Sequence, residues 1–246
     1  MAGEKTTTFA FDESLRFFLP ASQRSGPLTL RHRERQSLKH LIESLGVPHT
    51  EVGEVLVNGR PVSLDEIAED GDQVQVRAAS PGCPIEEPRF LLDSHLGRLA
   101  AYLRMCGFDC LYANDYEDAR LVEILTREER ILLSRDRRLL MRKNVRHGYC
   151  LRSLEPRQQL YEVIRRFALG GQIVPFRRCL RCNALLEPVE KSAILHRLEP
   201  KTKRYFDEFV LCRTCDQIYW KGSHWEHMQT LLNSLSGLPS PTARPV

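Results

Sequence analysis

The sequence predicts three successive folded parts: a small α+β domain, an α/β domain with a parallel sheet, and a short cysteine-rich ribbon. Alternating apolar residues and one helical segment fill roughly the first 80 residues. Short apolar runs then alternate with amphipathic segments up to about residue 170, which is typical of a parallel sheet flanked by helices. Two CxxC pairs follow, and their spacing suits a metal-bound ribbon.

The first domain, residues 8–79, is expected to consist of strands around one helix. Apolar and polar residues alternate along TFAFDESLRFFL. The segment LKHLIESL has one apolar helical face, with Ser37 placed to cap its start and Gly46 its end. Asn58-Gly59 lies between two apolar runs and is a hairpin signal. Two strands, a helix and two further strands give a β-grasp order.

Composition sets the other boundaries. Residues 80–88, SPGCPIEEP, contain three prolines and are expected to form a linker. Residues 89–170 hold the strand–helix alternation, and Gly170-Gly171 is expected to stop its last helix. Residues 171–233 hold the CxxC pairs and a final helix, and residues 234–246 are expected to be a disordered tail.

The charge distribution points to a polyanionic partner. Residues 1–80 carry a net charge of −3 and residues 81–246 a net charge of +7, so the basic part coincides with the α/β domain and the ribbon. No apolar stretch is long enough to span a membrane, and the first residues lack the apolar core of a signal peptide. We therefore expect a cytoplasmic protein that binds nucleic acid and not membranes.

Aspartates follow the predicted strands of the α/β domain. Asp93, Asp115 and Asp136 each come after an apolar run, and Asp118 lies three residues past Asp115. Ligands of parallel sheets bind beyond the carboxyl ends of the strands, and clustered carboxylates need a cation among them. Mg²⁺ or Mn²⁺ is expected there and can activate water for attack at phosphorus. The alternative for each aspartate is a helix N-cap.

The order FLLDSHLGRLAAYLRMCGFD, NDYED and RILLSRDRRLL resembles the PIN-like nucleases. More closely it resembles the Mut-seven C-terminal RNase family, whose bacterial members often carry an N-terminal ubiquitin-like domain and a C-terminal zinc ribbon. The likeness covers about residues 8–233. It implies a metal-dependent ribonuclease in which Asp93 and Asp136 bind the metal and Asp115 or Asp118 is the third carboxylate. PIN-like enzymes commonly use four acidic residues, a number reached here only if both take part.

The segment LVNGRPVSLDEIAEDGDQVQV resembles the ubiquitin-like sulfur carriers of molybdopterin and thiamine synthesis. Those carriers end in a free Gly-Gly tail, whose carboxylate is the group that becomes activated. Here the chain runs on from Val76 into AASPGCPIEEP. The first domain is therefore expected to dock a protein partner and not to carry sulfur.

Arginines surround the expected carboxylate site. The run SRDRRLLMRK contains Asp136, and two further arginines lie on the helix after Asp93. Such residues suit sequence-independent phosphate contacts, although a run of this kind can also be a solvated helix face. The arginines expected to bind nucleic acid are Arg98, Arg104, Arg135, Arg137, Arg138 and Arg142.

The two CxxC pairs are expected to hold one structural zinc ion through four thiolates. The ligands are Cys179, Cys182, Cys212 and Cys215. A closed site of this kind is not catalytic. The other cysteines, Cys83, Cys106, Cys110 and Cys150, are expected to be small buried hydrophobes.

Two functions of different classes stay open. The first is hydrolysis of RNA by the metal-bound carboxylates. The second is a non-catalytic RNA-binding adaptor, with the ribbon and arginines on RNA and the first domain recruiting a partner. Trp220 and Trp225 are expected to pack on the ribbon, with stacking on RNA bases as the alternative.

Overall fold

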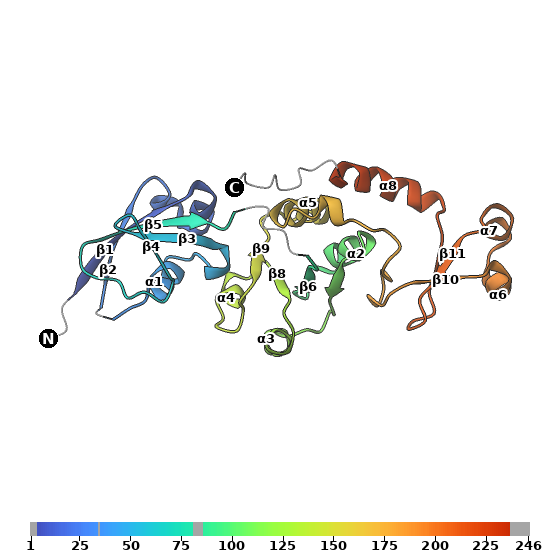
Figure 1. Ribbon diagram of the computed structural model, residues 1–246, viewed down its shortest axis with the longest axis horizontal. Coiled ribbons are helices and arrows are strands. Elements are labelled where there is room, and N and C mark those ends of the chain that lie inside the picture. Colours follow the sequence, from blue (N-terminus) through green and yellow to red (C-terminus); the bar gives the residue numbers. More distant parts are fainter. Residues whose placement is uncertain (1–3, 34, 81–85, 237–246) are drawn as a thin grey trace. The chain divides into compact units, whose positions relative to one another are not determined.

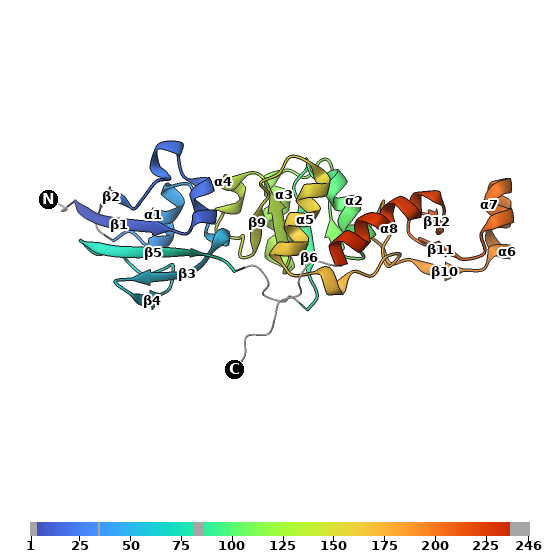
Figure 2. The same ribbon diagram turned by 90° about the horizontal axis from the view of Figure 1, so that it is seen from above.

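The computed structural model describes residues 4–33, 35–80 and 86–236, apart from the side chains of Ser223, His224, Glu226, His227 and Ser236. The chain forms two compact units. Unit 1 comprises residues 1–80 and 122–150, and unit 2 comprises residues 81–121 and 151–246. The α/β region therefore contributes to both units. Figures 1 and 2 label the elements in two views. Cys83 lies outside the described residues.

The β-grasp expectation for the first domain is confirmed. Its sheet has the order β2-β1-β5-β3-β4, with β1 parallel to β5 and the other neighbours antiparallel. The strands are β1 (Lys5–Phe11), β2 (Leu28–His32), β3 (Val52–Val57), β4 (Arg60–Val62) and β5 (Asp72–Ala78). Helix α1 (Leu38–Ser44) lies against this sheet and buries Leu41 and Ile42 in the core (Figure 1).

The local signals of this domain act as the sequence predicts. The Ser37 side chain accepts a hydrogen bond from the His40 amide at 3.3 Å, which caps α1. Gly46, with φ 96°, follows the helix end. Asn58 and Gly59 have φ values of 51° and 82°, which suits a tight turn between β3 and β4.

The first strand is shorter than the alternation of TFAFDESLRFFL suggests. β1 ends at Phe11, and the chain continues as the 3-10 helix η1 (Glu13–Phe18). This turn buries Leu15 and Phe18, as β1 buries Phe9. Two further 3-10 turns, η2 (Ala21–Gln23) and η3 (His49–Glu51), flank β2 and α1.

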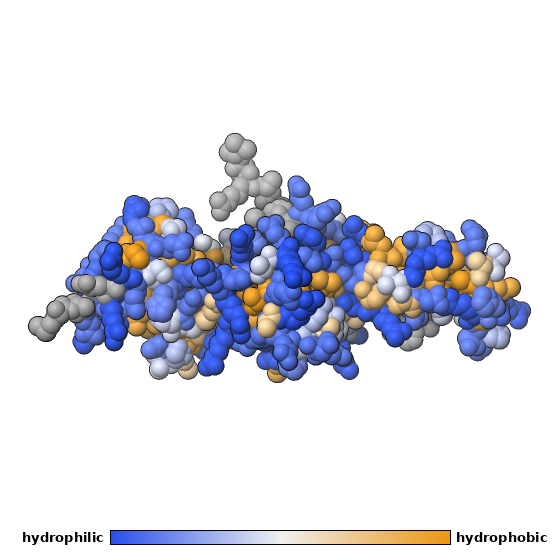
Figure 3. Space-filling view, turned by 90° about the horizontal axis from the view of Figure 1, so that it is seen from below, coloured by the Kyte–Doolittle hydropathy of each residue, from blue (hydrophilic) through white to orange (hydrophobic). Residues whose placement is uncertain are grey.

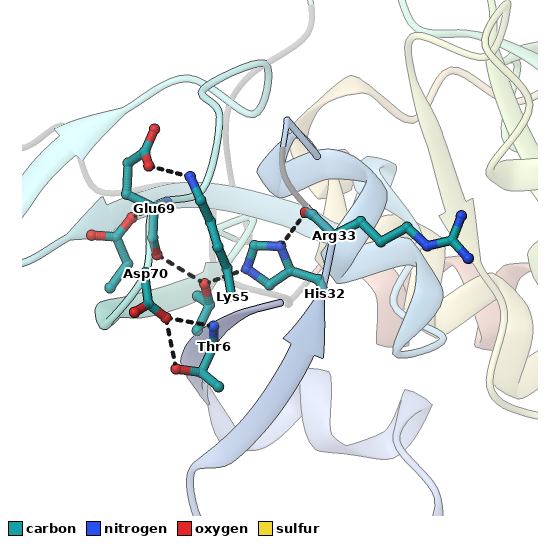
Figure 4. A network of polar contacts seen from close by, with 8 residues as sticks. Lys5, Thr6, His32, Arg33, Glu69 and Asp70 are labelled. Atoms are coloured by element: carbon teal, nitrogen blue, oxygen red, sulfur yellow. Dashed lines mark hydrogen bonds and ion pairs between the residues drawn. The ribbon is translucent and has the colours of Figure 1, made fainter. Parts of the chain in front are cut away.

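A polar network joins β1, β2 and the turn before β5 (Figure 4). The Thr6 amide and hydroxyl both donate to Asp70 Oδ1, at 2.8 and 3.0 Å. Lys5 forms an ion pair with Glu69. The two hydrogen bonds from Thr6 lower the pKa of Asp70 below its usual value of 3.8, because they favour the carboxylate.

The elements between residues 118 and 150 alternate helix and strand, as expected. They are α3 (Asp118–Arg127), β8 (Ile131–Ser134), α4 (Arg137–Leu140) and β9 (Gly148–Cys150). β8 and β9 are parallel, with Leu132 opposite Gly148 and Ser134 opposite Cys150. Every residue of β8 is buried, which explains its continuous apolar sequence.

Unit 2 contains the other parallel pair, β6 (Arg89–Leu92) and β7 (Asp109–Leu111). Helix α2 (Gly97–Met105) packs on α5 (Pro156–Arg166), as Figure 2 shows. The centroid of the Phe90 ring lies 6.2 Å from that of Phe108 and 5.9 Å from that of Phe167. The core of this part therefore forms around β6.

The end of α5 differs from the expectation. The helix stops after Arg166, and Ala168 takes the left-handed conformation with φ 51°. Gly170 instead begins the 3-10 turn η4 (Gly170–Gln172). The buried Phe167 packs on Phe90, so the aromatic core coincides with the helix end.

The ribbon is a three-stranded antiparallel sheet in the order β10-β11-β12. Its strands are β10 (Glu187–Val189), β11 (Phe209–Leu211) and β12 (Ile218–Tyr219). Short helices between β10 and β11 account for the long spacing between the CxxC pairs: α6 (Lys191–Ile194), η5 (Leu195–Arg197) and α7 (Pro200–Tyr205).

These ribbon elements enclose a small core of their own. Its buried residues are Ile194, Leu198, Phe209, Leu211 and Ile218. Apolar residues also gather over part of the ribbon surface, beside mainly hydrophilic ones (Figure 3). The last helix, α8 (Ser223–Ser236), extends three residues past the boundary of 233, where a disordered tail was expected. Residues 237–246 lie outside the described residues.

The Asp70 network makes a pH-dependent prediction. Because its folded pKa is lowered, Asp70 stabilises the β-grasp domain above the unfolded pKa, and that contribution disappears as the pH falls through the folded pKa. We expect Asp70→Asn to lower Tm at neutral pH and to flatten the fall of Tm between about pH 5 and pH 2. Thermal melts by circular dichroism measure this, with Asp65→Asn as the control. Identical pH profiles for wild type and Asp70→Asn would contradict it.

Candidate functional site

The four ribbon cysteines converge as the sequence predicts. Among the described residues, their sulfur atoms all lie within 4.8 Å of one another. The Cys179 and Cys215 sulfurs are 3.5 Å apart, and those of Cys182 and Cys212 are 3.3 Å apart. Tetrahedral zinc with Zn–S bonds of about 2.3 Å would place its sulfurs roughly 3.8 Å apart. The thiols therefore fit a closed four-coordinate metal site such as a structural zinc site.

The two CxxC turns have the same backbone geometry. In each, the amide of the first cysteine donates to the carbonyl five residues later, at 2.8 Å in the first turn and 2.9 Å in the second. The fifth residue of the turn donates back to the first cysteine's carbonyl, at 3.0 and 2.8 Å. That residue is Asn183 or Asp216, with φ values of 70° and 58°. Asn and Asp tolerate this left-handed conformation, which both knuckles require.

The Tyr219 hydroxyl lies 3.2 Å from the Cys179 sulfur. Burial raises the pKa of this thiol, but hydrogen bonds from Tyr219 and from the backbone at Cys182 and Arg181 oppose it and bring the pKa down to about 6. The thiolate is the form that binds metal. Tyr219 thus assists the site, and nothing in its spacing distinguished it from an ordinary strand aromatic.

Arg104 joins the first knuckle to the α/β core. Its Nε donates to the Cys110 carbonyl at 3.0 Å, and its Nη1 donates to the carbonyls of Leu180 and Arg181 at 3.1 and 2.9 Å. The residue is only 5% exposed. The burial and the three hydrogen bonds to carbonyls of the chain itself favour a structural role for Arg104 over the expected contact with nucleic acid.

Asn183 makes a second connection between the knuckle and β7. Its Oδ1 accepts from the Cys110 amide, and its Nδ2 donates to Asp109 Oδ1, both at 2.9 Å. Arg178 approaches the other oxygen of Asp109 at 3.3 Å. The ribbon therefore docks on β7 through side chains at the two ends of the first CxxC turn, Arg178 and Asn183. The repeated CxxC-Asn/Asp pattern in the sequence indicates the shared turn geometry but not this docking.

The predicted carboxylates differ in local structure. Asp93 follows β6 and is half-buried, and its Oδ1 accepts from the Ser94 amide at 2.6 Å. It does not cap α2, which begins at Gly97. Asp136 follows β8, is exposed, and caps α4. Its Oδ1 accepts from the amides of Arg138 at 2.7 Å and Leu139 at 3.3 Å.

The other two carboxylates lie between β7 and α3. Asp115 is exposed in the turn, and Asp118 is the first residue of α3 and half-buried. Asp93, Asp115 and Asp118 belong to unit 2, whereas Asp136 belongs to unit 1.

The other five predicted arginines differ in exposure. Arg98, Arg135, Arg138 and Arg142 are exposed. Arg137 is half-buried, and its Nη1 donates to the Phe18 carbonyl of the β-grasp domain at 2.8 Å. Arg137 therefore contacts the β-grasp domain, whereas its neighbours Arg135 and Arg138 face solvent.

Comparison with known families decides the relationship. Residues 88–232 match the Mut7-C RNAse domain, and residues 4–82 match the Mut7-C ubiquitin domain. The chain belongs to the Mut7-C RNAse family. The predicted order of a ubiquitin-like domain before the nuclease domain is thereby confirmed. No curated protein and no solved structure shows significant similarity to the chain. Family membership indicates a nuclease-type function.

Unit 2 of this Mut7-C protein contains a cavity of about 600 Å³. Aromatic side chains and two arginines contribute to its lining, among them Tyr102, Arg157, Phe176, Arg178, Trp220 and Trp225. The ring centroids of Trp225 and Phe176 are 4.8 Å apart, and those of Trp220 and Phe209 are 6.2 Å apart. The expected packing on the ribbon is confirmed for Trp220, which remains partly exposed, whereas Trp225 packs on Phe176, ahead of the first CxxC pair.

The remaining described cysteines of the Mut7-C protein behave as small hydrophobes. Cys106, Cys110 and Cys150 are all buried. Burial raises the pKa of the Cys106 thiol to about 12, so it is neutral at physiological pH. Among the described residues, no helix has the length and apolar character needed to cross a membrane.

The buried guanidinium gives a stability prediction. Arg104→Met should lower the free energy of unfolding by about 3 kcal/mol, because the hydrogen bonds to three carbonyls, one of them buried, are lost. Urea denaturation measures the change. Arg98→Met, on the exposed side of the same helix, should change stability by less than about 0.5 kcal/mol. Equal effects of the two substitutions would contradict a structural role for Arg104.

Metal removal should destabilise β7 as well as the ribbon. A chelator is expected to unfold the CxxC turns, because such sites fold with their metal. The Cys110 amide then loses its acceptor, Asn183 Oδ1, so its hydrogen exchange should accelerate. Hydrogen-exchange mass spectrometry tests this, with the Phe9 region of β1 as internal control. Ribbon unfolding without any change at β7 would show that the two are independent.

Proposed function

We propose that this Mut7-C protein is a metal-dependent ribonuclease that hydrolyses RNA phosphodiesters. The match of residues 88–232 to the RNAse domain carries the proposal. The catalytic ion would be Mg²⁺ or Mn²⁺, held by Asp93 and Asp136 together with Asp115, Asp118 or both.

The positions of the carboxylates support this assignment. Asp93 follows β6 and Asp136 follows β8, and each strand has a parallel neighbour. Ligands of parallel sheets gather beyond the carboxyl ends of the strands. The two hydrogen bonds that cap α4 both use Asp136 Oδ1. Its Oδ2 can therefore bind a cation without loss of the cap.

The chain's residues would divide the chemistry between them. A bound divalent ion supplies an activated water and stabilises charge at phosphorus. The aspartates hold and orient that ion, which hard oxygen ligands suit. Exposed arginines hold the phosphates of the RNA, so binding weakens as salt rises. These arginines are Arg98, Arg135, Arg138 and Arg142.

Cleavage of labelled single-stranded RNA tests the proposal. Wild type should cut in Mn²⁺ or Mg²⁺ and stop in EDTA. Asp136→Asn should lower the rate by about 100-fold or more, because a metal ligand is lost. Asparagine is itself a good N-cap, so α4 should persist. Asp65→Asn, an exposed carboxylate of the β-grasp domain, is the matched control. Metal-independent cleavage, or full activity in Asp136→Asn, would refute the assigned site.

The cavity in unit 2 favours a second candidate function, a non-catalytic RNA-binding adaptor. Its aromatic rings and arginines suit stacking with RNA bases. If the adaptor function holds, wild type binds RNA without cutting it under any metal condition. Trp220→Ala should then weaken binding, whereas Asp136→Asn should not. Fluorescence anisotropy in EDTA measures these affinities. A protein partner for the ubiquitin-like domain would complete such an adaptor.

A further inference from the structure

Within unit 1 the β-grasp domain holds the residue that follows Asp136. The guanidinium of Arg137 lies over two aromatic rings, 5.4 Å from the Phe17 centroid and 5.1 Å from that of Phe18. Its Nη1 also donates to the Phe18 carbonyl at 2.8 Å. Cation–π attraction and a charged hydrogen bond act on the same group, so the side chain has a defined position.

The β-grasp domain also closes the edge of β9. Within the part of the chain that the structure describes, this strand lies at the end of its sheet and has a strand neighbour on one side only. The Cys150 amide donates to Glu51 Oε1 at 2.6 Å, and Glu51 is only 4% exposed. A buried carboxylate thus satisfies a donor that an open edge would leave exposed.

A third contact involves Val145, which lies between Arg137 and Cys150 in the sequence. His49 Nε2 is 2.7 Å from the Val145 carbonyl, and Nδ1 is 2.6 Å from Glu43 Oε1. A carbonyl only accepts, so Nε2 donates to Val145. His49 thereby connects α1 to the loop between α4 and β9. The three contacts together hold the segment from Arg137 to Cys150.

We propose that the β-grasp domain is a positioning part of the nuclease, in which Arg137, held by Phe17 and Phe18, fixes Asp136 in the orientation that binds metal. This inference rests on the proposed ribonuclease function. It assigns Arg137 to positioning and not to RNA binding. It also makes the surface around Phe18, His49 and Glu51 an internal interface that is not open to another protein.

The shortness of α4 is the physical reason. A helix of four residues is not stable alone, because the entropy lost in forming the first turn exceeds the free energy gained from its few hydrogen bonds. Asp136 keeps its rotamer only while the amides of Arg138 and Leu139 stay in place to bond Oδ1. The Arg137 side chain anchors this turn from outside. Loss of the anchor should loosen the turn and, with it, the carboxylate.

Four substitutions in the full chain test the inference. Arg137→Gln and Phe17→Ala each remove one side of the anchor, and Arg137→Lys keeps the cation. Arg138→Gln is the control, since that side chain is exposed. Phe17 is 40% exposed, so its truncation spares the core, unlike that of the buried Phe18. Thermal melts check that every variant is folded.

Two readouts that do not need catalysis come first. Hydrogen exchange at Arg138 and Leu139 should accelerate in Arg137→Gln and Phe17→Ala. Mn²⁺ affinity, from electron paramagnetic resonance, should fall roughly tenfold in both, as for other groups that orient a ligand. Arg137→Lys should be intermediate, and Arg138→Gln should match wild type. In cleavage assays, kcat should fall with KM unchanged.

RNA affinity without divalent ions separates the alternatives. The inference expects Arg137→Gln to bind RNA like wild type and Arg138→Gln to bind more weakly. It is overturned if Arg137→Gln weakens RNA binding and lowers the salt slope by about 1 while exchange and Mn²⁺ affinity stay normal. Unchanged exchange and Mn²⁺ affinity in both anchor variants overturn it too. Absence of Mn²⁺ binding and cleavage in wild type instead refutes the ribonuclease function itself.

Discussion

Burying a guanidinium is costly unless its N–H groups are hydrogen-bonded, and Arg104 makes three such bonds where β7 and the first CxxC turn come together. Asn183 reinforces the same junction through Cys110 and Asp109. The ribbon therefore shares its stability with the α/β core of unit 2. A metal held by the four thiols would therefore stabilise both the ribbon and the α/β core. The carbonyls of Leu180 and Arg181 are in place to accept from Arg104 only when the CxxC turn is formed.

The β-grasp domain follows a related physical logic in unit 1. Glu51 satisfies the Cys150 amide at the edge of β9, and the Phe17–Phe18 pair receives Arg137. Each contact gives a polar or charged group of the nuclease segment a fixed partner in the β-grasp domain. Without that partner the group would be solvated by water and its side chain or backbone would be more mobile. The turns of the ubiquitin-like domain therefore contact its own chain, which favours an integral role for this domain.

The candidate carboxylates show that strand-end aspartates need not act alike. Asp93 bonds the neighbouring Ser94 amide and leaves the capping of α2 to the backbone. Asp136 caps α4 with Oδ1 alone. Capping and metal binding are compatible at Asp136, because a carboxylate has two oxygens and several lone pairs. The N-cap and active-site interpretations of one aspartate are thus not exclusive.

Local patterns in the sequence determined the element order, the Asn58-Gly59 turn, the Ser37 cap and the four thiols of the ribbon, because each depends on residues close in the chain or on fixed ligand chemistry. Tertiary packing decided the rest. Arg104, Arg137 and Arg138 look equivalent in the sequence, yet the first is buried on carbonyls, the second lies on aromatic rings and the third is exposed. Arginine can serve any of these roles, since its long side chain takes its partner from whatever the fold brings within reach.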